Sequence, residues 1–231
     1  AMTELIGTAS VYPFEPVKTE LVLDKVALKA FLSHTHKHHY RAKTDVFRPG
    51  DPAGTLFYVI SGSLTINTEE PDGRELVLGY VNPGEFIGEM GLFFKVHRRE
   101  VVLRTKGPCE MAEIDYDLLR YLFSHQLSQE CPKIMFAIGS QISKRLLETS
   151  RKASRLAHLD VANRILRTLH DLSREPDAIR HPDGIQLKVS RQELARITGC
   201  SREMAGRALK QLQQKNLLTA RGKTIVLFGS L

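Results

Sequence analysis

Four charged side chains recur at helical spacing near the end of the chain: Arg202, Glu203, Arg207 and Lys210. On one helix they would share the outer face, and four apolar residues would face inward: Met204, Ala205, Ala208 and Leu209. Arginine can donate two hydrogen bonds to the edge of guanine, and glutamate can accept one from cytosine. Arg202 and Glu203 fall in the first turn, the part of a recognition helix that meets base edges. The pattern predicts a helix that reads the major groove of DNA.

Two short helices joined by a tight turn must position these side chains, and residues 189–210 have the signals for both. Ser190 can cap the first helix, and Glu193 three residues later completes a capping box. Gly199 has the backbone freedom that a sharp turn needs, and Ser201 can cap the second helix. This predicts a helix-turn-helix; the alternative is an amphipathic helix pair with a solvated basic face. Further DNA contacts are expected from Ser190, Arg191, Gln192 and Ser201.

Residues 217–227 read as a two-stranded wing that turns at 221–223, where Lys223 suits a phosphate contact. The charge distribution agrees with this interpretation. Residues 1–130 hold 14 basic and 18 acidic residues, a net charge of −4, whereas residues 131–231 hold 19 and 8, a net charge of +11. An acidic N-terminal part and a strongly basic C-terminal part favour nucleic-acid contact through the C-terminal half.

Composition narrows the class of protein. The chain has 231 residues, 42% of them hydrophobic, which suits one large domain or two ordinary ones. No apolar run approaches the ~18 residues of a membrane span, and the N-terminus lacks the order of a secretion signal, so we expect no membrane partner. The three cysteines, Cys109, Cys131 and Cys200, have neither disulfide-framework nor metal-site spacing. We therefore expect a cytoplasmic protein.

The front of the chain reads as short strands separated by glycine and proline turns, which predicts a β-sandwich or barrel. The expected strands are Thr55–Ser61, Leu64–Ile66, Leu76–Val81, Val101–Arg104 and Cys109–Ile114. Short helices are expected at Leu23–Leu32 and Asp115–Phe123. Residues 1–24 read as a flexible tail, and residues 25–131 as the β-domain.

A long helix is expected over residues 132–158, opened by Pro132 in its first turn. Its apolar positions form a near-heptad seam: Met135, Ile138, Ile142, Leu146, Thr149, Ala153 and Leu156. Such a seam predicts a parallel two-helix coiled coil and hence a homodimer; the alternative is packing on the chain's own β-domain. Asp160 can cap a new helix, so residues 159–231 are expected to form the DNA-binding domain.

A histidine cluster lies before the strands, at His34, His36, His38 and His39. No carboxylate or thiolate partners are adjacent, and alternate residues of a strand share a face without enclosing an ion. We predict no metal site. The chain also lacks a nucleophile–base set, so we do not expect an enzyme, although β-sandwich folds can host catalysts.

The helix-turn-helix stretch, continued through Gly222–Val226, is similar to the DNA-reading motif of the cyclic-AMP receptor protein (catabolite activator, CRP/FNR) family. The resemblance covers nearly the whole chain after about residue 24, and is strongest to the CRP-like regulators of plant-associated bacteria, a group connected with virulence. It implies an α+β chain with three parts: an N-terminal β jelly-roll cyclic-nucleotide-binding domain, a long dimerisation helix and a C-terminal winged helix-turn-helix domain. It also implies a transcription regulator, mainly an activator, that acts on double-stranded palindromic DNA.

The same resemblance implies contacts with the RNA polymerase α subunit. His36 and His38 match polymerase-contacting histidines of the family. Residues 177–184 are expected to form a surface loop whose polymerase contacts would be Ile179, Arg180, His181 and Gly184.

Residues 84–93 resemble the first half of the family's phosphate-binding cassette. Gly88 would allow a close approach of the backbone to an anion, and Glu89 would hold a ribose 2′-hydroxyl. In the second half, Arg99 keeps the family's arginine, but Glu100 stands where serine or threonine normally donates to the phosphate. A carboxylate about 4 Å from a phosphate is repelled by about 4 kcal/mol in a partly wet site. We therefore predict weak cyclic-AMP binding.

Other positions favour a larger anionic ligand. Thr149 and Ser150 match the family's adenine contacts, and Glu100 could accept the donors of a guanine. Arg151, Arg155 and Arg167 could form an anion-binding cluster; the alternative is DNA-facing or solvated charge. We expect no required cofactor, with cyclic di-GMP as an allosteric inhibitor of a dimer that binds DNA without ligand. The alternative is a conventional activator that needs cyclic AMP.

Overall fold

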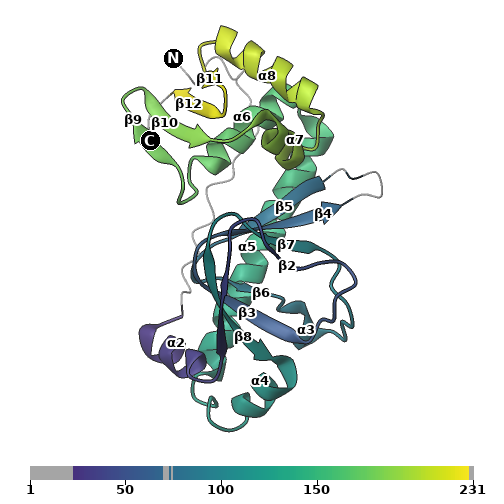
Figure 1. Cartoon of the computed structure of the whole chain (residues 1–231), viewed down its shortest axis with the longest axis vertical. Helices are drawn as coiled ribbons and strands as arrows, with labels where there is room; N and C mark the ends of the chain where they lie inside the picture. Colours follow the sequence, from purple (N-terminus) through teal and green to yellow (C-terminus); the bar gives the residue numbers. More distant parts are fainter. Residues whose placement is uncertain (1–22, 70–72, 74, 229–231) are drawn as a thin grey trace. The chain divides into compact units, whose positions relative to one another are not determined.

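The computed structural model describes residues 23–69, 73 and 75–228. Of the predicted tail at 1–24, residues 1–22 lie outside the described part, as do residues 70–72, 74 and 229–231. The chain divides into two compact units, which meet between Ser150 and Arg151, inside the long helix α5 (Cys131–His158) (Figure 1). The first part of α5 therefore belongs to the first unit and its last turns to the second.

The first unit is built on two four-stranded antiparallel sheets with the orders β1-β8-β3-β6 and β2-β7-β4-β5. The strands are β1 (His36–Tyr40), β2 (Asp45–Phe47), β3 (Thr55–Ser61), β4 (Leu64–Glu69), β5 (Glu75–Val81), β6 (Phe86–Ile87), β7 (Val102–Thr105) and β8 (Cys109–Asp115). Side chains from both sheets, among them Phe57, Leu64 and Leu103, form one buried core. The five predicted strands are all present, and Thr55–Ser61 has the predicted bounds.

A second core lies between the β1-β8-β3-β6 sheet and the helices α2 (Lys25–Leu32), α4 (Tyr116–Phe123) and α5. Phe31 of α2 packs edge-to-face on Phe86, with ring centroids 5.5 Å apart. Asp24 and Asp115 cap α2 and α4 through their carboxylates. A four-residue helix, α3 (Met90–Phe93), follows β6.

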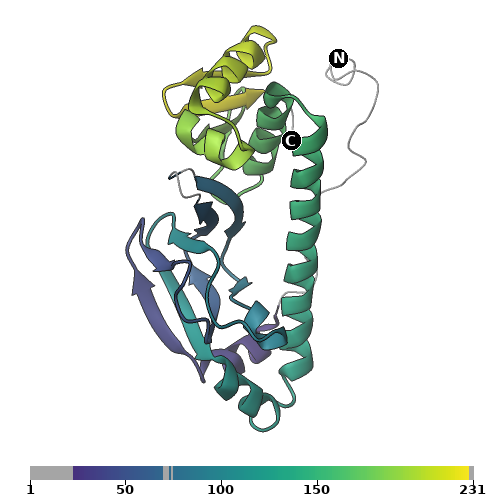
Figure 2. The ribbon, with the colours of Figure 1, turned by 90° about the vertical axis from the view of Figure 1, so that its right-hand side faces the viewer.

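The long helix is present, but its predicted seam is wrong in the first half. Ile138 is 1% exposed and Ile142 packs against the same core, so both face the chain's own β-sheet. The periodicity predicts an apolar face on the helix, but it does not distinguish packing on the chain's own β-sheet from packing on a partner helix. Figure 2 shows α5 as one long continuous helix. The large apolar side chains left exposed along it are Phe136, Leu146, Leu147 and Leu156.

The second unit contains, after the last turns of α5, helices α6 (Val161–Leu172), α7 (Arg191–Thr198) and α8 (Arg202–Gln214). An antiparallel sheet of order β11-β12-β10-β9 joins them, formed by β9 (Ile179–His181), β10 (Gly184–Lys188), β11 (Leu218–Arg221) and β12 (Thr224–Phe228). Ile165, Leu194 and Leu209 bring the three helices to one core. Asp160 caps α6 as predicted, accepting from the Asn163 N–H at 2.8 Å.

The predicted surface loop at 177–184 is partly wrong. Ile179–His181 pairs with β10 as a strand, so the segment is a hairpin turning at Pro182 and Asp183. The sequence signal, a proline followed by aspartate and glycine, marked the turn but not the short strand before it. Ile179 is 56% exposed on this hairpin.

Candidate functional site

Local capping fixes the two helices of the helix-turn-helix. The Ser190 hydroxyl accepts the Glu193 N–H at 3.1 Å, and the Ser201 hydroxyl accepts the Met204 N–H at 3.1 Å. Gly199 ends α7 in the left-handed conformation, with φ 67° and ψ 50°. A side chain there would be strained, which explains why a glycine stands at this turn.

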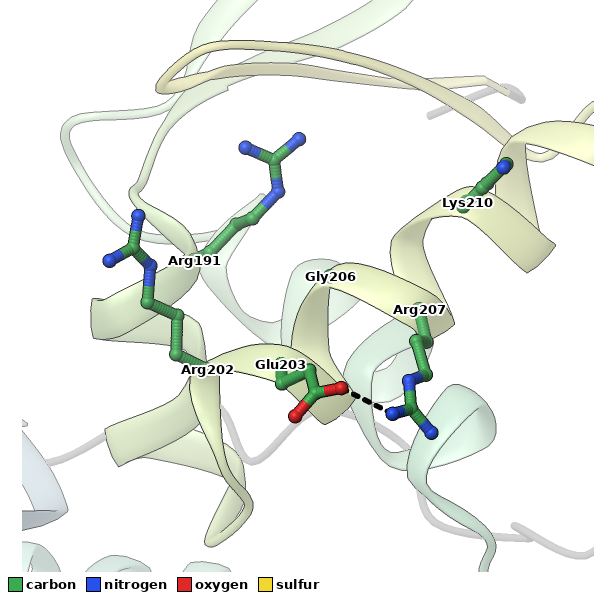
Figure 3. A pocket seen from close by; sticks show the side chains of 6 residues that line it. All are labelled: Arg191, Arg202, Glu203, Gly206, Arg207 and Lys210. Atoms are coloured by element: carbon green, nitrogen blue, oxygen red, sulfur yellow. Dashed lines mark hydrogen bonds and ion pairs between the residues drawn. The ribbon is translucent and has the colours of Figure 1, made fainter.

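The outer side of α8 borders an open hollow of about 640 Å³ (Figure 3). Its lining residues come from the two helices of the motif: Arg191, Arg202, Glu203, Gly206, Arg207 and Lys210. Four cations face one carboxylate, so the hollow attracts a polyanion. These are the charged residues that the sequence analysis assigned to DNA, and the fold brings them together.

Within the hollow, Glu203 and Arg207 form an ion pair one turn apart on α8 (Figure 3). Both side chains are about three-quarters exposed, 74% and 76%, so water screens the pair and DNA can replace it at little cost. Met204 is 44% exposed, which corrects the prediction that it faces inward; Ala205 and Leu209 are buried as predicted.

Sequence reasoning did not single out Gly206, which lines the hollow. A Cβ built on it would lie 3.6 Å from Cδ of Arg191, an ordinary van der Waals contact, so the space there does not require a glycine. Glycine inside a helix was the available signal, because it costs about 1 kcal/mol relative to alanine. At the wing, Lys223 is exposed and its carbonyl accepts the Val189 N–H at 2.8 Å, next to the start of the motif. Gln192 is also exposed.

In the first unit, Arg99 lies beside Gly88 as the cassette resemblance implies. Gly88 has φ 83°, and a Cβ on it would lie 2.7 Å from Nη1 of Arg99. The guanidinium is buried, donates to the Thr55 carbonyl at 2.6 Å and to the Tyr116 hydroxyl at 3.3 Å, and stacks 4.5 Å from the centre of the Phe47 ring. The protein itself therefore engages two of this arginine's five N–H donors, and its buried Nε has no hydrogen-bond partner in the described part of the chain.

Glu89 is also held from within the unit. Its Oε1 pairs with Nη1 of Arg145 on α5 at 3.2 Å, and Arg145 also donates to the Phe86 carbonyl. The other carboxylate oxygen, Oε2, is buried and has no hydrogen-bond partner in the described part of the chain. It is positioned to accept a hydroxyl or amide donor from a small molecule.

One turn before Arg145, Gln141 links α5 to the cassette segment around Phe86. Its Oε1 accepts the Phe86 N–H at 2.7 Å and its Nε2 donates to the Gly84 carbonyl at 3.1 Å. Neither residue was predicted. The spacing of Gln141, Arg145 and Thr149, four residues apart, was a signal that one helix face points towards the cassette.

Glu100 is exposed although its neighbour Arg99 is buried, and across the described residues it forms no hydrogen bond or ion pair. Thr149 and Ser150 are exposed on α5. At the position where the resemblance implies a hydroxyl donor in the family, this chain therefore presents a solvated carboxylate.

Of the three arginines predicted to form an anionic-ligand cluster, Arg155 forms an ion pair with Asp171 of α6. Burial, and then the charge of Arg155, lowers the pKa of Lys152 from 10.5 to about 8. On α6, burial followed by the charges of Arg167 and Arg174 lowers the pKa of His170. Sequence reasoning missed the carboxylate partner of Arg155, and the anion-binding role of the three arginines stays a prediction. Arg151 lies half-buried on α5.

The residues predicted to touch polymerase lie on two strands. His36 and His38 are exposed on β1 at the edge of its sheet, where Nε2 of His38 lies 3.7 Å from Glu113. Arg180 and His181 belong to β9, and Gly184 begins β10. Over the residues that the structure describes, no three histidine, cysteine or acidic side chains converge to hold a metal.

A β-unit with a nucleotide-type cassette, followed by a winged helix-turn-helix unit, defines a class of ligand-responsive transcription regulators. Residues 37–126 match the family model for the cyclic nucleotide-binding domain, and residues 163–228 match the Crp-like helix-turn-helix domain. The chain is 64% identical over 210 residues to the CRP-like protein Clp of Xanthomonas oryzae pv. oryzae, covering 91% of each chain. It is equally similar to the Clp protein of Xanthomonas campestris pv. campestris, over the same share.

Among solved structures, the c-di-GMP-responsive global regulator CLP of Xanthomonas campestris, which links cell–cell signalling to virulence gene expression, superposes with a TM-score of 0.85. It is 64% identical, and the match covers 90% of this chain and all of that one. A CRP/FNR-family regulator from Thermus thermophilus shares the fold, with a TM-score of 0.69 at 22% identity over 84% of this chain and 94% of that one. The chain belongs to the CRP/FNR family and is a Clp-like transcription regulator with a DNA-binding helix-turn-helix, not an enzyme. No helix in the described part is long and apolar enough to cross a membrane.

Proposed function

We propose that the protein is a cytoplasmic homodimer that binds a palindromic DNA site without ligand, and that cyclic di-GMP inhibits this binding. One observation carries the ligand-independent part. Arg99 and Glu89, the two charged residues through which the family's cassette would hold a nucleotide, are engaged by Thr55, Tyr116 and Arg145 of the same chain. The pocket is thus assembled without a nucleotide.

Cyclic AMP is a poor match for this pocket. The phosphate would have to compete with the Thr55 carbonyl and the Tyr116 hydroxyl for Arg99, and the neighbouring Glu100 repels an anion. One observation still favours the cyclic-AMP-activated alternative. The unpartnered Oε2 of Glu89 could accept a ribose hydroxyl.

An inhibitory site for cyclic di-GMP is supported by the basic residues at the end of α5 and on α6. Two phosphates need more than one cation, and Arg151, Arg155 and Arg167 could supply them, together with Thr149 and Ser150 for a base. The ligand would compete with Asp171 for Arg155. It can shift the protein towards a non-binding state only by binding that state more tightly. The solved c-di-GMP-responsive relative supports this choice of effector.

The homodimer is supported by the exposed apolar side chains of α5. Phe136 and Leu147 are eleven residues apart, or about three helical turns, so they lie on one side of the helix. A palindromic site requires two recognition helices about 34 Å apart, one turn of DNA, and a homodimer carries two. Leu147→Glu should yield monomers in sedimentation velocity and lose affinity for the palindrome. Glu148→Gln, an exposed change of charge about 100° further around the helix, should leave both unchanged.

Activation through the RNA polymerase α subunit is the remaining part of the proposal. The exposed β1 edge and the β9–β10 hairpin offer the side chains for it. Ile179→Asp should lower transcription from a purified promoter system while leaving DNA affinity unchanged. An equal fall in DNA affinity would instead place Ile179 in the DNA-binding machinery.

The deciding experiment is fluorescence anisotropy of a labelled palindromic site at fixed salt, without ligand, with cyclic AMP and with cyclic di-GMP. The proposal expects tight binding without ligand and loss of binding on adding cyclic di-GMP. Arg155→Gln should retain DNA binding but resist the inhibitor. Binding that appears only with cyclic AMP would establish the alternative.

Arg202 offers a separate test of the DNA contact. Arg202→Ala should cost about 1–3 kcal/mol and relax the preference at one base pair. If all sequences were weakened equally, Arg202 would contact phosphate rather than a base.

A further inference from the structure

An exposed surface of aromatic and basic side chains follows α3, on the segment that connects the two halves of the cassette. We call it the Phe–Lys surface; its members are Phe93, Phe94, Lys95, His97 and Arg98. Phe93 is 47% and Phe94 66% exposed, and the three basic residues are exposed as well. No acidic residue occurs in the stretch 90–99, although residues 1–130 carry a net charge of −4. Two neighbouring phenylalanines in water are unfavourable unless something covers them.

The backbone of this segment is held in place. Three hydrogen bonds fix it: Phe94 N–H to the Met90 carbonyl at 2.9 Å, Ala53 N–H to the His97 carbonyl at 3.2 Å, and Arg98 Nη1 to the Gly50 carbonyl at 2.6 Å. At its base, Gly91 packs directly on the ring of Tyr116, where a Cβ would collide. The phenylalanines are therefore presented from an ordered support, and a partner would bind without first ordering the segment.

Neither the pocket nor the helix-turn-helix accounts for these side chains. Arg99, the next residue, turns inward to the Thr55 carbonyl and the Tyr116 hydroxyl. Phe94 and Lys95 remain at the surface of the first unit, outside the hollow lined by α7 and α8.

We propose that the Phe–Lys surface docks an acidic amphipathic segment of a partner protein. Apolar side chains of that segment cover Phe93 and Phe94, and its carboxylates face Lys95 and Arg98. Aromatic residues and arginine are the types enriched at protein interfaces, and opposite charge at the rim sets orientation. An anionic lipid surface fits less well, because stable electrostatic attachment to membranes usually requires four or more lysines and arginines in a cluster.

The chain contains no tryptophan, which allows a site-specific test. Phe94→Trp in the full-length protein creates a single tryptophan fluorophore on the surface without removing the aromatic character of the position. The probe is a synthetic amphipathic helix of about five turns, with leucines along one face and glutamates along the other. A scrambled peptide of the same composition is the control. We expect saturable quenching or a blue shift of the tryptophan emission with the amphipathic peptide only.

Two further variants locate the binding. Adding Lys95→Glu to the reporter should weaken the peptide by about fivefold, the factor expected for one exposed ion pair. Tyr121→Trp, which places the fluorophore on the 54%-exposed position of α4, should not respond. Circular dichroism melting confirms that each variant is folded.

Four outcomes would overturn the proposal. The scrambled peptide binds as well as the amphipathic one, or Lys95→Glu leaves the affinity unchanged. Phosphatidylglycerol vesicles shift the Phe94→Trp emission while the peptide does not, which would make the surface a lipid site. In sedimentation velocity, Phe94→Asp changes the oligomeric state, which would make its occupant a second copy of this chain.

Discussion

Gln141 provides a sharp test of how the long helix is fastened to the cassette. It is 6% exposed, accepts the buried Phe86 N–H at 2.7 Å and donates to the partly buried Gly84 carbonyl at 3.1 Å. Gln141→Leu keeps a similar volume but removes both bonds. A buried group left without a partner costs about 1–3 kcal/mol, and a partly solvated one less. The expected loss of stability is about 2–4 kcal/mol.

Urea unfolding followed by circular dichroism measures this loss, and hydrogen exchange localises it. The Phe86 amide should lose most of its protection, because its acceptor is gone. Ser143→Ala is the matched control, since that residue lies half a turn away on α5, is exposed, and bonds only to the Gly139 carbonyl of its own helix.

The reasoning would be refuted by either of two results. If Gln141→Leu unfolds within about 0.5 kcal/mol of the wild type, as an ordinary surface substitution does, the amide is not a structural link. The same holds if the Phe86 amide keeps its protection, because another acceptor must then reach it.

Four other changes test separate parts of the structure. Ser201→Ala removes the N-cap of α8 and should cost about 1 kcal/mol in thermal unfolding, with weaker DNA binding. Gly199→Ala forces a side chain into the left-handed region and should cost about 1–2 kcal/mol by the same measurement. Burial lowers the pKa of Lys152 from 10.5 to about 8, so the cost of burying the charged amine is fully present below pH 8 and is relieved as the pH rises to 10.5. Lys152→Met should therefore be more stable than the wild type at about pH 7, with a difference that narrows as the pH rises through this range in urea titrations. Glu100→Ser should raise cyclic-AMP affinity in calorimetry; an unchanged affinity would contradict the cassette interpretation.

Features governed by neighbouring residues could be predicted from the sequence. Ser190, Ser201 and Asp160 each cap the helix that was expected to follow, because a cap needs only a side-chain oxygen and the next turn of backbone. Gly199 has the positive φ that a sharp turn requires. The charged face of α8 also follows from spacing alone, since helical geometry determines which side chains are neighbours.

Features that depend on what covers a surface could not be predicted from periodicity. Ile138 and Leu146 belong to one apolar stripe of α5, yet the first is 1% and the second 68% exposed. The stripe has the same period in both halves, but only the first half meets the β-sheet core. The prediction that Met204 faces the core was wrong for a related reason. Its spacing suits the core, but on α8 it is exposed, next to Arg202 and Glu203 in sequence.

The partners of the charged residues in the ligand pocket could not be predicted from the sequence either, and they affect how a ligand could regulate the protein. Sequence reasoning proposed Glu89 and Arg99 as ligand contacts but did not foresee that both have partners within the chain. Their partners come from distant parts of the chain: Arg145 lies 56 residues beyond Glu89, and the Thr55 carbonyl 44 residues before Arg99. A nucleotide that uses these groups must displace bonds the protein already has, so only the excess of new over old interactions can shift the conformation. An effector that binds elsewhere, such as at Arg155, leaves the cassette bonds in place. At Arg155 it would compete with the carboxylate of Asp171, which is half exposed.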